Sequence, residues 1–324
     1  MRCRRGPPPT VGVVNKLTRR TARAARWGVG LSALTFGVLF AECRVSLRVI
    51  NGVPHPEPPN STGVFGRDLE GVPLKVALLG DSSAAGYGLD KVEETPGTLL
   101  AEGLMERTRR RVHFHDLTVV GAMASDLGAQ VRQAIAEQAD LAVILVGAND
   151  VVHMVRPSQS RRHLVRAVSS LLDSGCAVLV GTCPDLGTIG PVLPPLRHVV
   201  RAWSRRIAFE QSIYVVKAGG RTVSLADILG PEFKAHPDFL FGPDRFHPSA
   251  PGYERLANVL IPASLAALGL LDDSQATLET YLGGTAIPIA AAAAMAANRP
   301  GTELGPTPRP RGRLGRIWAT AGRR

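Results

Sequence analysis

The chain has 324 residues, of which 45% are apolar and 20% are charged, a composition typical of a globular protein with a sizeable core. This composition excludes a wholly disordered or fibrous chain. The net charge of +11 is concentrated at the ends, because +8 on residues 1–26 and +6 on residues 298–324 leave −3 for residues 27–297. The basicity therefore bears on contact with membranes or polyanions, and we expect no specific nucleic-acid partner.

An uncharged apolar run at residues 27–41 follows the basic N-terminus. As a helix this run would span about 22 Å, against about 30 Å for the hydrocarbon layer of a membrane. Its length therefore fits the apolar region of a signal peptide at least as well as a permanent span, and a buried core helix is the third alternative. Positive charge before the run predicts that the N-terminus stays in the cytoplasm. We expect a membrane anchor, uncleaved or slowly cleaved, at residues 27–43, with the folded part outside the cytoplasm in the cell envelope.

Changes in composition predict the remaining boundaries. Residues 1–26 are expected to form a basic cytoplasmic N-terminus, and residues 44–73 a proline-rich linker. Periodic structure predicts one folded domain over residues 74–271. Residues 272–324 are rich in alanine, proline and arginine, and this composition predicts a disordered tail.

Within the predicted domain, short apolar runs with β-branched residues predict buried strands, and apolar residues every three or four positions predict helices. The strands are expected at residues 75–80, 112–120, 141–146, 177–180 and 213–216. The helices are expected at residues 98–110, 126–138, 164–172, 196–209 and 249–268. The alternation predicts an α/β fold in which a parallel sheet of about five strands lies between two helical layers, a three-layer α/β/α sandwich. Functional residues of such sheets lie at the carboxyl ends of the strands.

Four polar blocks follow three of the predicted strands and precede the last predicted helix. They are Gly80-Asp81-Ser82, Gly121, Gly147-Ala148-Asn149-Asp150 and Asp244-Arg245-Phe246-His247. Because the carboxyl ends of parallel strands meet at one edge of a sheet, we expect the first three blocks to converge there. The fourth block stands in the last loop, where it can join them.

These residue types fit nucleophilic catalysis by a serine. The hydroxyl of Ser82 needs an adjacent base, and histidine is the usual one. His247 in turn needs an acceptor that fixes its tautomer, and Asp244 can supply it from three residues away. A tetrahedral oxyanion needs hydrogen-bond donors aimed at it, for which the backbone N–H of Gly121 and the side-chain amide of Asn149 are suited.

In order and spacing, the four blocks resemble those of the SGNH/GDSL hydrolases. The resemblance implies that Ser82 is the nucleophile, His247 the general base and acid, and Asp244 the carboxylate that orients the histidine. It also implies an oxyanion hole formed by the N–H groups of Ser82 and Gly121 and the side chain of Asn149. The fold of that family is a flavodoxin-like three-layer sandwich, in agreement with the predicted elements.

The resemblance covers about residues 74–268 and implies a serine esterase that hydrolyses carboxylic esters through an acyl-enzyme. The expected substrates are short-chain acyl or acetyl esters, among them lipid or glycan esters of the cell envelope. Lysophospholipids and acyl thioesters also suit this apparatus. No metal or organic cofactor is expected, and the oligomeric state is left open.

Two alternatives concern the reactive groups themselves. Ser83 stands where many relatives have leucine, so its hydroxyl is a rival nucleophile. A metal site built from Asp81, Asp150, Asp244 and His247 is chemically possible, since carboxylate and imidazole groups ligate metals. That alternative leaves Ser82 and Asn149 without a role, and we therefore favour the serine hydrolase. Asp150 is expected to be a structural hydrogen-bonding partner at the strand end.

Two further alternatives concern the function. An acyltransferase would use the same site and pass the acyl group to an alcohol instead of water. A catalytically inactive, membrane-tethered binding protein would use its arginine-rich ends to hold anionic lipid or nucleic acid. The second alternative is disfavoured because every reactive group of a hydrolase is present.

Overall fold

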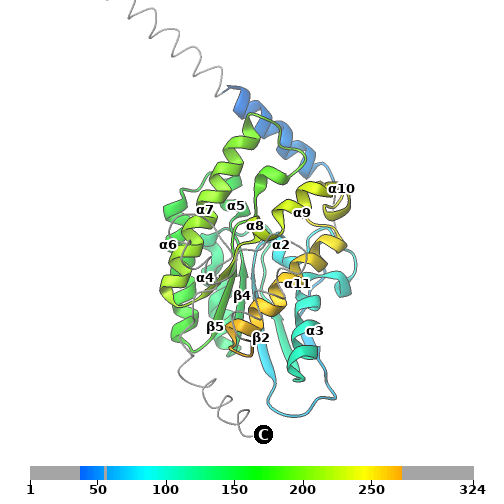
Figure 1. Cartoon of the computed structure of the whole chain (residues 1–324), viewed down its shortest axis with the longest axis vertical. Coiled ribbons are helices and arrows are strands. Elements are labelled where there is room, and N and C mark those ends of the chain that lie inside the picture. Colours follow the sequence, from blue (N-terminus) through cyan, green and yellow to red (C-terminus); the bar gives the residue numbers. More distant parts are fainter. Residues whose placement is uncertain (1–36, 55–56, 272–324) are drawn as a thin grey trace, which may run out of the picture. The chain divides into compact units, whose positions relative to one another are not determined.

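The computed structural model describes residues 37–54 and 57–271 (Figure 1). The chain divides into two compact units, Met1–Arg48 and Val49–Arg324. In the first unit, the described residues 37–48 are helical. Among the residues described, no helix is both long enough and apolar enough to cross a membrane. Most of the predicted anchor at residues 27–43 lies outside the described residues, as do the basic N-terminus at 1–26 and the tail at 272–324.

The second unit contains a six-stranded sheet with the strand order β1-β3-β2-β4-β5-β6. The strands are β1 (Gly63–Phe65), β2 (Leu74–Gly80), β3 (Val112–Asp116), β4 (Leu141–Leu145), β5 (Ala177–Gly181) and β6 (Arg221–Val223). Five strands are parallel, and β1 runs antiparallel to β3 at one edge. The predicted parallel α/β sheet is confirmed, with one strand more than expected. Two strands were not predicted, and the first of them, β1, comes from residues that the sequence places in the linker.

Helices cover both faces of this sheet (Figure 1). The longer ones are α3 (Pro96–Thr108), α4 (Leu127–Ala136), α6 (Pro157–Asp173), α7 (Leu196–Ala218) and α11 (Ala250–Ala267). The shorter ones are α2 (Ser82–Ala85), α5 (Ala148–Val152), α8 (Leu225–Ile228), α9 (Gly230–Ala235) and α10 (Pro237–Leu240). Alternate residues of each strand enter different cores, so Leu78 packs with α3 and α11, whereas Leu79 packs with α4 and α6. The predicted three-layer sandwich is therefore confirmed.

One predicted strand is wrong. Residues 213–216 belong to α7, which runs unbroken for 23 residues. The β-branched run suggested a strand, but Ile207, Ala208, Gln211 and Val215 are buried at helical spacing, and this packing decides the conformation. Gly219 ends the helix in the left-handed conformation, at φ 97°. The strand that follows, β6, has only three residues and begins with a charged one, so its pattern is too short to predict.

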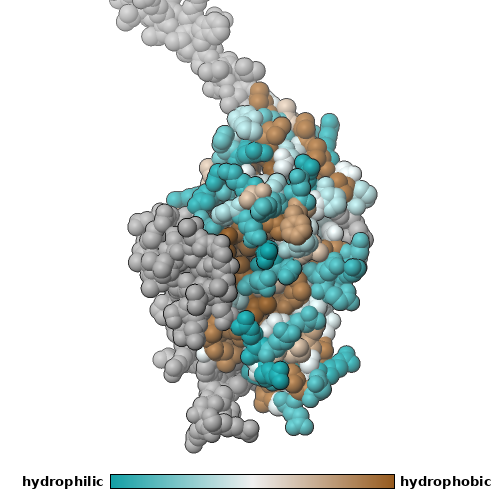
Figure 2. All heavy atoms as spheres, turned by 45° about the vertical axis from the view of Figure 1, so that its right-hand side comes forward, coloured by the Kyte–Doolittle hydropathy of each residue, from teal (hydrophilic) through white to brown (hydrophobic). Residues whose placement is uncertain are grey.

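The predicted strand at residues 112–120 is shorter in the structure, where β3 ends at Asp116. The remainder forms the loop that carries Gly121 past the end of β2, with the N–H of Val119 donating to the carbonyl of Gly80 at 3.0 Å. On the face of the molecule in Figure 2, hydrophilic and hydrophobic residues are interspersed. Single apolar residues at a surface are ordinary in a folded protein and indicate no site by themselves.

Candidate active site

Ser82 is the first residue of α2, immediately beyond the end of β2. The turn between them depends on Gly80, which has φ 143° and whose missing Cβ would lie 2.0 Å from the carbonyl oxygen of Leu145. The carboxylate of Asp81 then caps α2 by accepting the N–H of Ser83 at 2.9 Å. The glycine and the cap together place the Ser82 side chain at the carboxyl edge of the sheet.

His247 lies in the loop that leads into α11, and Asp244 organises that loop. One carboxylate oxygen of Asp244 accepts the backbone N–H groups of Phe246 and His247, at 2.9 and 3.0 Å. The other oxygen lies 2.6 Å from Nδ1 of His247. The loop is closed by a 2.8 Å hydrogen bond from the N–H of Gly242 to the carbonyl of His247. One acidic side chain therefore fixes both the backbone and the imidazole.

The structure brings Ser82, His247 and Asp244 into one hydrogen-bonded chain. Nε2 of His247 lies 2.9 Å from Oγ of Ser82, although 165 residues separate the two in sequence. All three residues are buried, with 7%, 8% and 2% of their surface exposed, respectively. The hydroxyl that reaches the imidazole is that of Ser82, while neighbouring Ser83 uses its N–H to bind Asp81.

Aromatic side chains hold the imidazole from two sides. The ring of Tyr87 lies 4.6 Å from that of His247, and the ring of Phe246 lies 4.8 Å away in an edge-to-face arrangement. Tyr253, fully buried in α11, donates its hydroxyl to the carbonyl of Tyr87 at 3.0 Å. These contacts restrict the His247 ring to the orientation that reaches Ser82.

Gly121 lies in the loop after β3 and Asn149 lies in α5, and hydrogen bonds tie these two segments together. Nδ2 of Asn149 donates to the carbonyl of Ala122 at 3.1 Å, and buried Asp150 accepts the N–H of Ala124 at 3.1 Å. Gly121 is the third residue of a turn that is closed by the N–H of Ala122 donating to the carbonyl of Val119 at 3.0 Å. Its φ of 83° is one that favours glycine at this position of a turn, and a Cβ there would meet open space. Its N–H makes no hydrogen bond within the described part of the chain. Asp150 has the structural role expected from the sequence.

Two buried glutamines that were not predicted from the sequence hold the strand ends in place. Gln130 of α4 both donates to the carbonyl of Gly80 and accepts its N–H, at 3.1 and 2.8 Å. Gln211 of α7 accepts the N–H of Cys183 at 2.7 Å and donates to the carbonyl of Val146 at 3.0 Å. Each side chain satisfies backbone groups where the ladder of the sheet ends, and so supports the loops that carry the candidate residues.

Burial raises the pKa of a carboxyl group and hydrogen bonds to it lower that pKa, and the balance between the two differs at Asp81 and Asp244. Burial raises the pKa of Asp81 to about 6, against the weaker lowering effect of its hydrogen bonds and of nearby His247. Burial also acts to raise the pKa of Asp244, but the hydrogen bonds from His247 and Phe246 together outweigh it and leave that pKa below its usual value. Asp244 is therefore the carboxylate that stays ionised beside the imidazole.

A cavity of about 100 Å³ lies beside the turn between β2 and α2, with Asp81, Ser83 and Phe246 in its wall. Most of the other lining residues are apolar, including Leu145 and Ile189. Among the described residues, no three His, Cys, Asp or Glu side chains are grouped as metal ligands would be. The arrangement provides an aligned hydroxyl, base and carboxylate, with an apolar recess next to them.

A family model described as the GDSL-like Lipase/Acylhydrolase family matches residues 78–255, more than half of the chain. The chain belongs to this family. It is therefore a hydrolase that acts on ester bonds, as the resemblance implied. The matched range contains all four blocks, from the Ser82 turn to the His247 loop.

Among GDSL relatives, the GDSL-like esterase Rv1075c of Mycobacterium tuberculosis is 39% identical over 222 residues, 65% of this chain and 71% of that protein. The crystal structure of TesA aligns with 60% of this chain and 98% of its own, at 18% identity and a TM-score of 0.48. A mutant of Axe2, an acetyl-xylooligosaccharide esterase from Geobacillus, aligns with 60% of this chain and 94% of its own, at 19% identity and a TM-score of 0.48.

Proposed function

We propose that the protein is a serine esterase that hydrolyses short-chain acyl or acetyl esters through an acyl-enzyme. In this proposal Ser82 is the nucleophile, His247 is the general base and acid, and Asp244 orients the imidazole. The observation that carries the proposal is the continuous chain from Ser82 Oγ through His247 to Asp244, with separations of 2.9 and 2.6 Å. These separations are those of hydrogen bonds that can transfer and stabilise a proton.

The mechanism follows from these contacts. Nδ1–H of His247 donates to Asp244, which leaves Nε2 free to accept the proton of Ser82 as its oxygen attacks the ester carbonyl. The tetrahedral intermediate collapses when the C–O bond breaks, and the departing alcohol takes the proton from Nε2. Water then attacks the acyl-serine, gives a proton to His247 and releases the carboxylic acid, while the proton returns to Ser82.

The oxyanion hole in this proposal consists of the N–H groups of Ser82 and Gly121 and the side-chain amide of Asn149. The N–H of Ser82 is at the first position of α2, where no helical acceptor exists, and that of Gly121 is also without an acceptor in the described residues. The amide of Asn149 has a second hydrogen beyond the one that binds Ala122. Three donors are thus available for the developing negative charge.

The cavity beside Ser83 supports a short acyl group. Its volume of about 100 Å³ is well below the roughly 300–1,000 Å³ of pockets that hold larger ligands. Its apolar lining favours an alkyl chain over a polar one. The acetyl-xylooligosaccharide esterase among the structural relatives is consistent with an acetyl substrate, as its name describes.

A fluorophosphonate probe tests the proposal directly, because it reacts preferentially with the activated serine of a serine hydrolase. The full chain should be labelled at Ser82, mapped by mass spectrometry, and the label should be lost in His247→Ala. The same preparation should hydrolyse p-nitrophenyl acetate. Label on Ser83, or equal hydrolysis by Ser82→Ala, would overturn the assignment of the nucleophile, and no label on folded protein would count against a serine hydrolase.

We also propose that the enzyme is held at a membrane by its N-terminal segment, with the catalytic domain outside the cytoplasm. The basic residues 1–26 and the apolar run at 27–41 support this placement. Fractionation of cells that express the full chain, followed by protease treatment of intact spheroplasts, tests it. Membrane-bound, protease-accessible protein is expected, and protein recovered in the soluble cytoplasmic fraction would contradict the placement.

A further inference from the structure

Two segments that are far apart in sequence supply much of the wall of the cavity proposed for the acyl group. The loop after β5, residues 182–189, is one of them and contributes Leu186 and Ile189; we call it the β5 loop. Helix α8 and the turn that follows it contribute Leu225 and Leu229. An outward shift of either segment would enlarge the cavity, so the contacts that hold the two segments determine its size.

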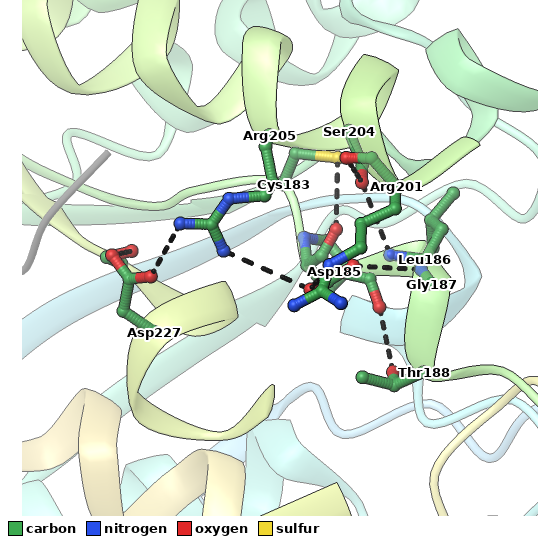
Figure 3. A network of polar contacts seen from close by, with 11 residues as sticks. Cys183, Asp185, Leu186, Gly187, Thr188, Arg201, Ser204, Arg205 and Asp227 are labelled. Carbon is green, nitrogen blue, oxygen red and sulfur yellow. Dashed lines mark hydrogen bonds and ion pairs between the residues drawn. The ribbon is translucent and has the colours of Figure 1, made fainter. Parts of the chain in front are cut away.

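Two side chains of α7 hold the β5 loop. Oγ of Ser204 accepts the N–H of Leu186 at 3.3 Å, and Nε of Arg201 donates to the carboxylate of Asp185 at 3.1 Å. Figure 3 shows Arg201 and Ser204 reaching from the helix toward this loop. Because α7 runs unbroken for 23 residues and Ser204 is fully buried in it, the helix is a firm support for the loop.

The β5 loop has room for Arg201 because it carries a glycine at the point of contact. A Cβ on Gly187 would lie 2.8 to 2.9 Å from Cβ, Cγ and Cδ of Arg201. The second carboxylate oxygen of Asp185 accepts the N–H of Gly187 at 2.9 Å, and its backbone carbonyl accepts the hydroxyl of Thr188 at 2.7 Å. Arg201 therefore lies directly against a turn that Asp185 organises, and Asp185 and Thr188 are both in the cavity wall.

Arg205, four residues beyond Arg201 on the same face of α7, connects the β5 loop with α8. Its guanidinium donates to Asp227 of α8 at 3.2 Å and lies 3.9 Å from Asp185. The other oxygen of Asp227 accepts the hydroxyl of Ser224, the residue before α8, at 3.0 Å. Figure 3 shows Arg205 between the two carboxylates. One side chain of α7 therefore contacts both wall segments.

The burial of Asp185 distinguishes this network from ordinary surface ion pairs. Pairs in open solvent contribute little to stability, because water and salt screen their charges. The side chain of Asp185 is only 5% exposed, and those of Arg205 and Asp227 are 35% and 25% exposed. Removal of either arginine would leave a buried carboxylate with fewer partners, and we expect the β5 loop to shift so that water reaches that carboxylate.

We propose that Arg201 and Arg205 determine which acyl chains the enzyme accepts, by holding the β5 loop and α8 against α7. We call these two residues, with Asp185 and Asp227, the arginine clamp. Neither arginine lines the cavity, and neither does Asp227, so these residues act through the two wall segments and not by contact with substrate. This inference rests on the proposed esterase function and assigns the residues that set its acyl specificity.

The test measures the preference of the full chain for long over short acyl groups, as the ratio of kcat/KM for p-nitrophenyl hexanoate to kcat/KM for p-nitrophenyl acetate. Arg201→Met and Arg205→Met should each raise this ratio about three- to tenfold, because a loosened wall admits additional methylene groups. Both rates come from one preparation, so the ratio does not depend on the fraction of the protein that is folded. An unchanged ratio in either variant would overturn the inference.

A neighbouring arginine and the other end of the clamp provide the controls. Arg206 also lies on α7, but it pairs with Glu210 at 2.9 Å and lines no part of the cavity, so Arg206→Met should leave the ratio as in the native protein. Asp227→Ala removes the contact with Arg205 from the side of α8 and should also raise the ratio. Asp227→Ala combined with Arg205→Met should exceed Arg205→Met alone by less than about twofold, since both changes remove one contact. Effects that multiply, or an equal rise in Arg206→Met, would contradict the clamp.

Hydrogen exchange, followed by mass spectrometry, separates this inference from a failure of the esterase function, because it needs no substrate. In Arg205→Met, the backbone amides of the β5 loop and α8 should exchange about threefold or more faster than in the native protein, while those of α3 should not change. If the native protein hydrolysed neither ester, the proposed function would fail, and hydrogen exchange would still show whether the clamp holds the two segments. Unchanged exchange in both segments would overturn the inference, whatever the acyl preference of the variant.

Discussion

The buried hydroxyl of Tyr253 donates a 3.0 Å hydrogen bond to the backbone carbonyl of Tyr87. This bond joins the last helix to the loop after α2, and the ring of Tyr87 lies 4.6 Å from that of His247. The position of the His247 imidazole therefore depends on the hydrogen bond between Tyr253 and Tyr87, although neither group in that bond is charged. In the proposed mechanism, Tyr253 acts through Tyr87 as a positioning residue for His247.

Replacing Tyr253 by Phe should test this relationship. The change keeps the buried ring and removes one hydrogen bond, so the free energy of unfolding should fall by about 1 kcal/mol. We expect kcat on p-nitrophenyl acetate to fall about three- to tenfold with little change in KM, because the geometry of His247 becomes less uniform. Tyr214→Phe, which changes a tyrosine of α7 that lies outside the site, is the control. Loss of stability with unchanged kcat would assign Tyr253 a purely structural role.

Substitution of the two adjacent serines, Ser82 and Ser83, should have very different effects on activity. Ser82→Ala should lower kcat/KM by about a thousandfold or more, since the members of such a triad act as a unit. Ser83→Ala removes a hydroxyl but keeps the N–H that Asp81 caps, so activity should stay within about tenfold of the native value. Rates with p-nitrophenyl acetate, with folding checked by circular dichroism, decide between them. A larger loss in Ser83→Ala would reverse the assignment.

The buried side chain of Gln130 should contribute to the stability of the folded protein. In Gln130→Leu, the N–H of Gly80 loses the acceptor that Gln130 supplies, and the carbonyl of Gly80 loses one donor but keeps the N–H of Val119. These losses should lower the free energy of unfolding by about 1–3 kcal/mol, measured by urea denaturation. Gln133→Leu, an exposed position on the same helix, is the matched control and should change it by less than about 0.5 kcal/mol. Equal effects of the two variants would contradict a specific role for Gln130.

Asp81 should make the protein less stable as the pH rises through weakly acidic values. Its pKa is about 6 in the folded protein against 3.8 without burial, so the folded state binds more protons than the unfolded state between these values. The free energy of unfolding therefore falls with increasing pH in this window, by up to about 3 kcal/mol.

Asp81→Asn preserves an oxygen that can accept the N–H of Ser83 and removes the ionisation. The stability of this variant relative to the native protein should rise from pH 4 to pH 7, as measured by urea denaturation at each pH. Asp90→Asn, at an exposed carboxylate, is the control and should show no such trend. A difference between Asp81→Asn and the native protein that does not vary with pH would contradict the raised pKa.

The small cavity should set the preferred acyl length. Activity with p-nitrophenyl esters should fall beyond about four carbons, because a longer chain does not fit about 100 Å³. Ile189→Ala enlarges the cavity and should raise kcat/KM for the hexanoate relative to the acetate several-fold. Ile135→Ala, on α4 and absent from the cavity wall, is the control. An unchanged ratio in Ile189→Ala would place the acyl group elsewhere.

The sequence was sufficient for strands β2 to β5 because they are short runs that contain apolar residues and the flanking helices have regular spacing. It failed at residues 213–216, where β-branched residues sit in a helix whose buried face is decided by packing against the sheet. It also missed β6, since three residues are too few to show a period.

The candidate site likewise combines residues that could be predicted from the sequence with contacts that could not. Ser82, Asp244 and His247 could be selected from residue types, order and the strand-end rule. Gln130 could also have been selected, because it lies on the apolar face of a helix that the sequence predicted, beside Leu127 and Val131. Contacts such as that of Tyr253 with Tyr87 join segments 166 residues apart, and no local pattern indicates them.

The separation of 165 positions between Ser82 and His247 also affects the order of events during synthesis. At about 5–20 residues per second, Ser82 leaves the point of peptide-bond formation roughly 8–33 s before His247, its proposed base, is made. The His247 loop also precedes α11, which packs against α3, so the base is held only after nearly the whole domain has been translated. In the proposed mechanism, an unfinished polypeptide therefore carries an inert hydroxyl, and hydrolytic competence arises only when the domain is almost complete.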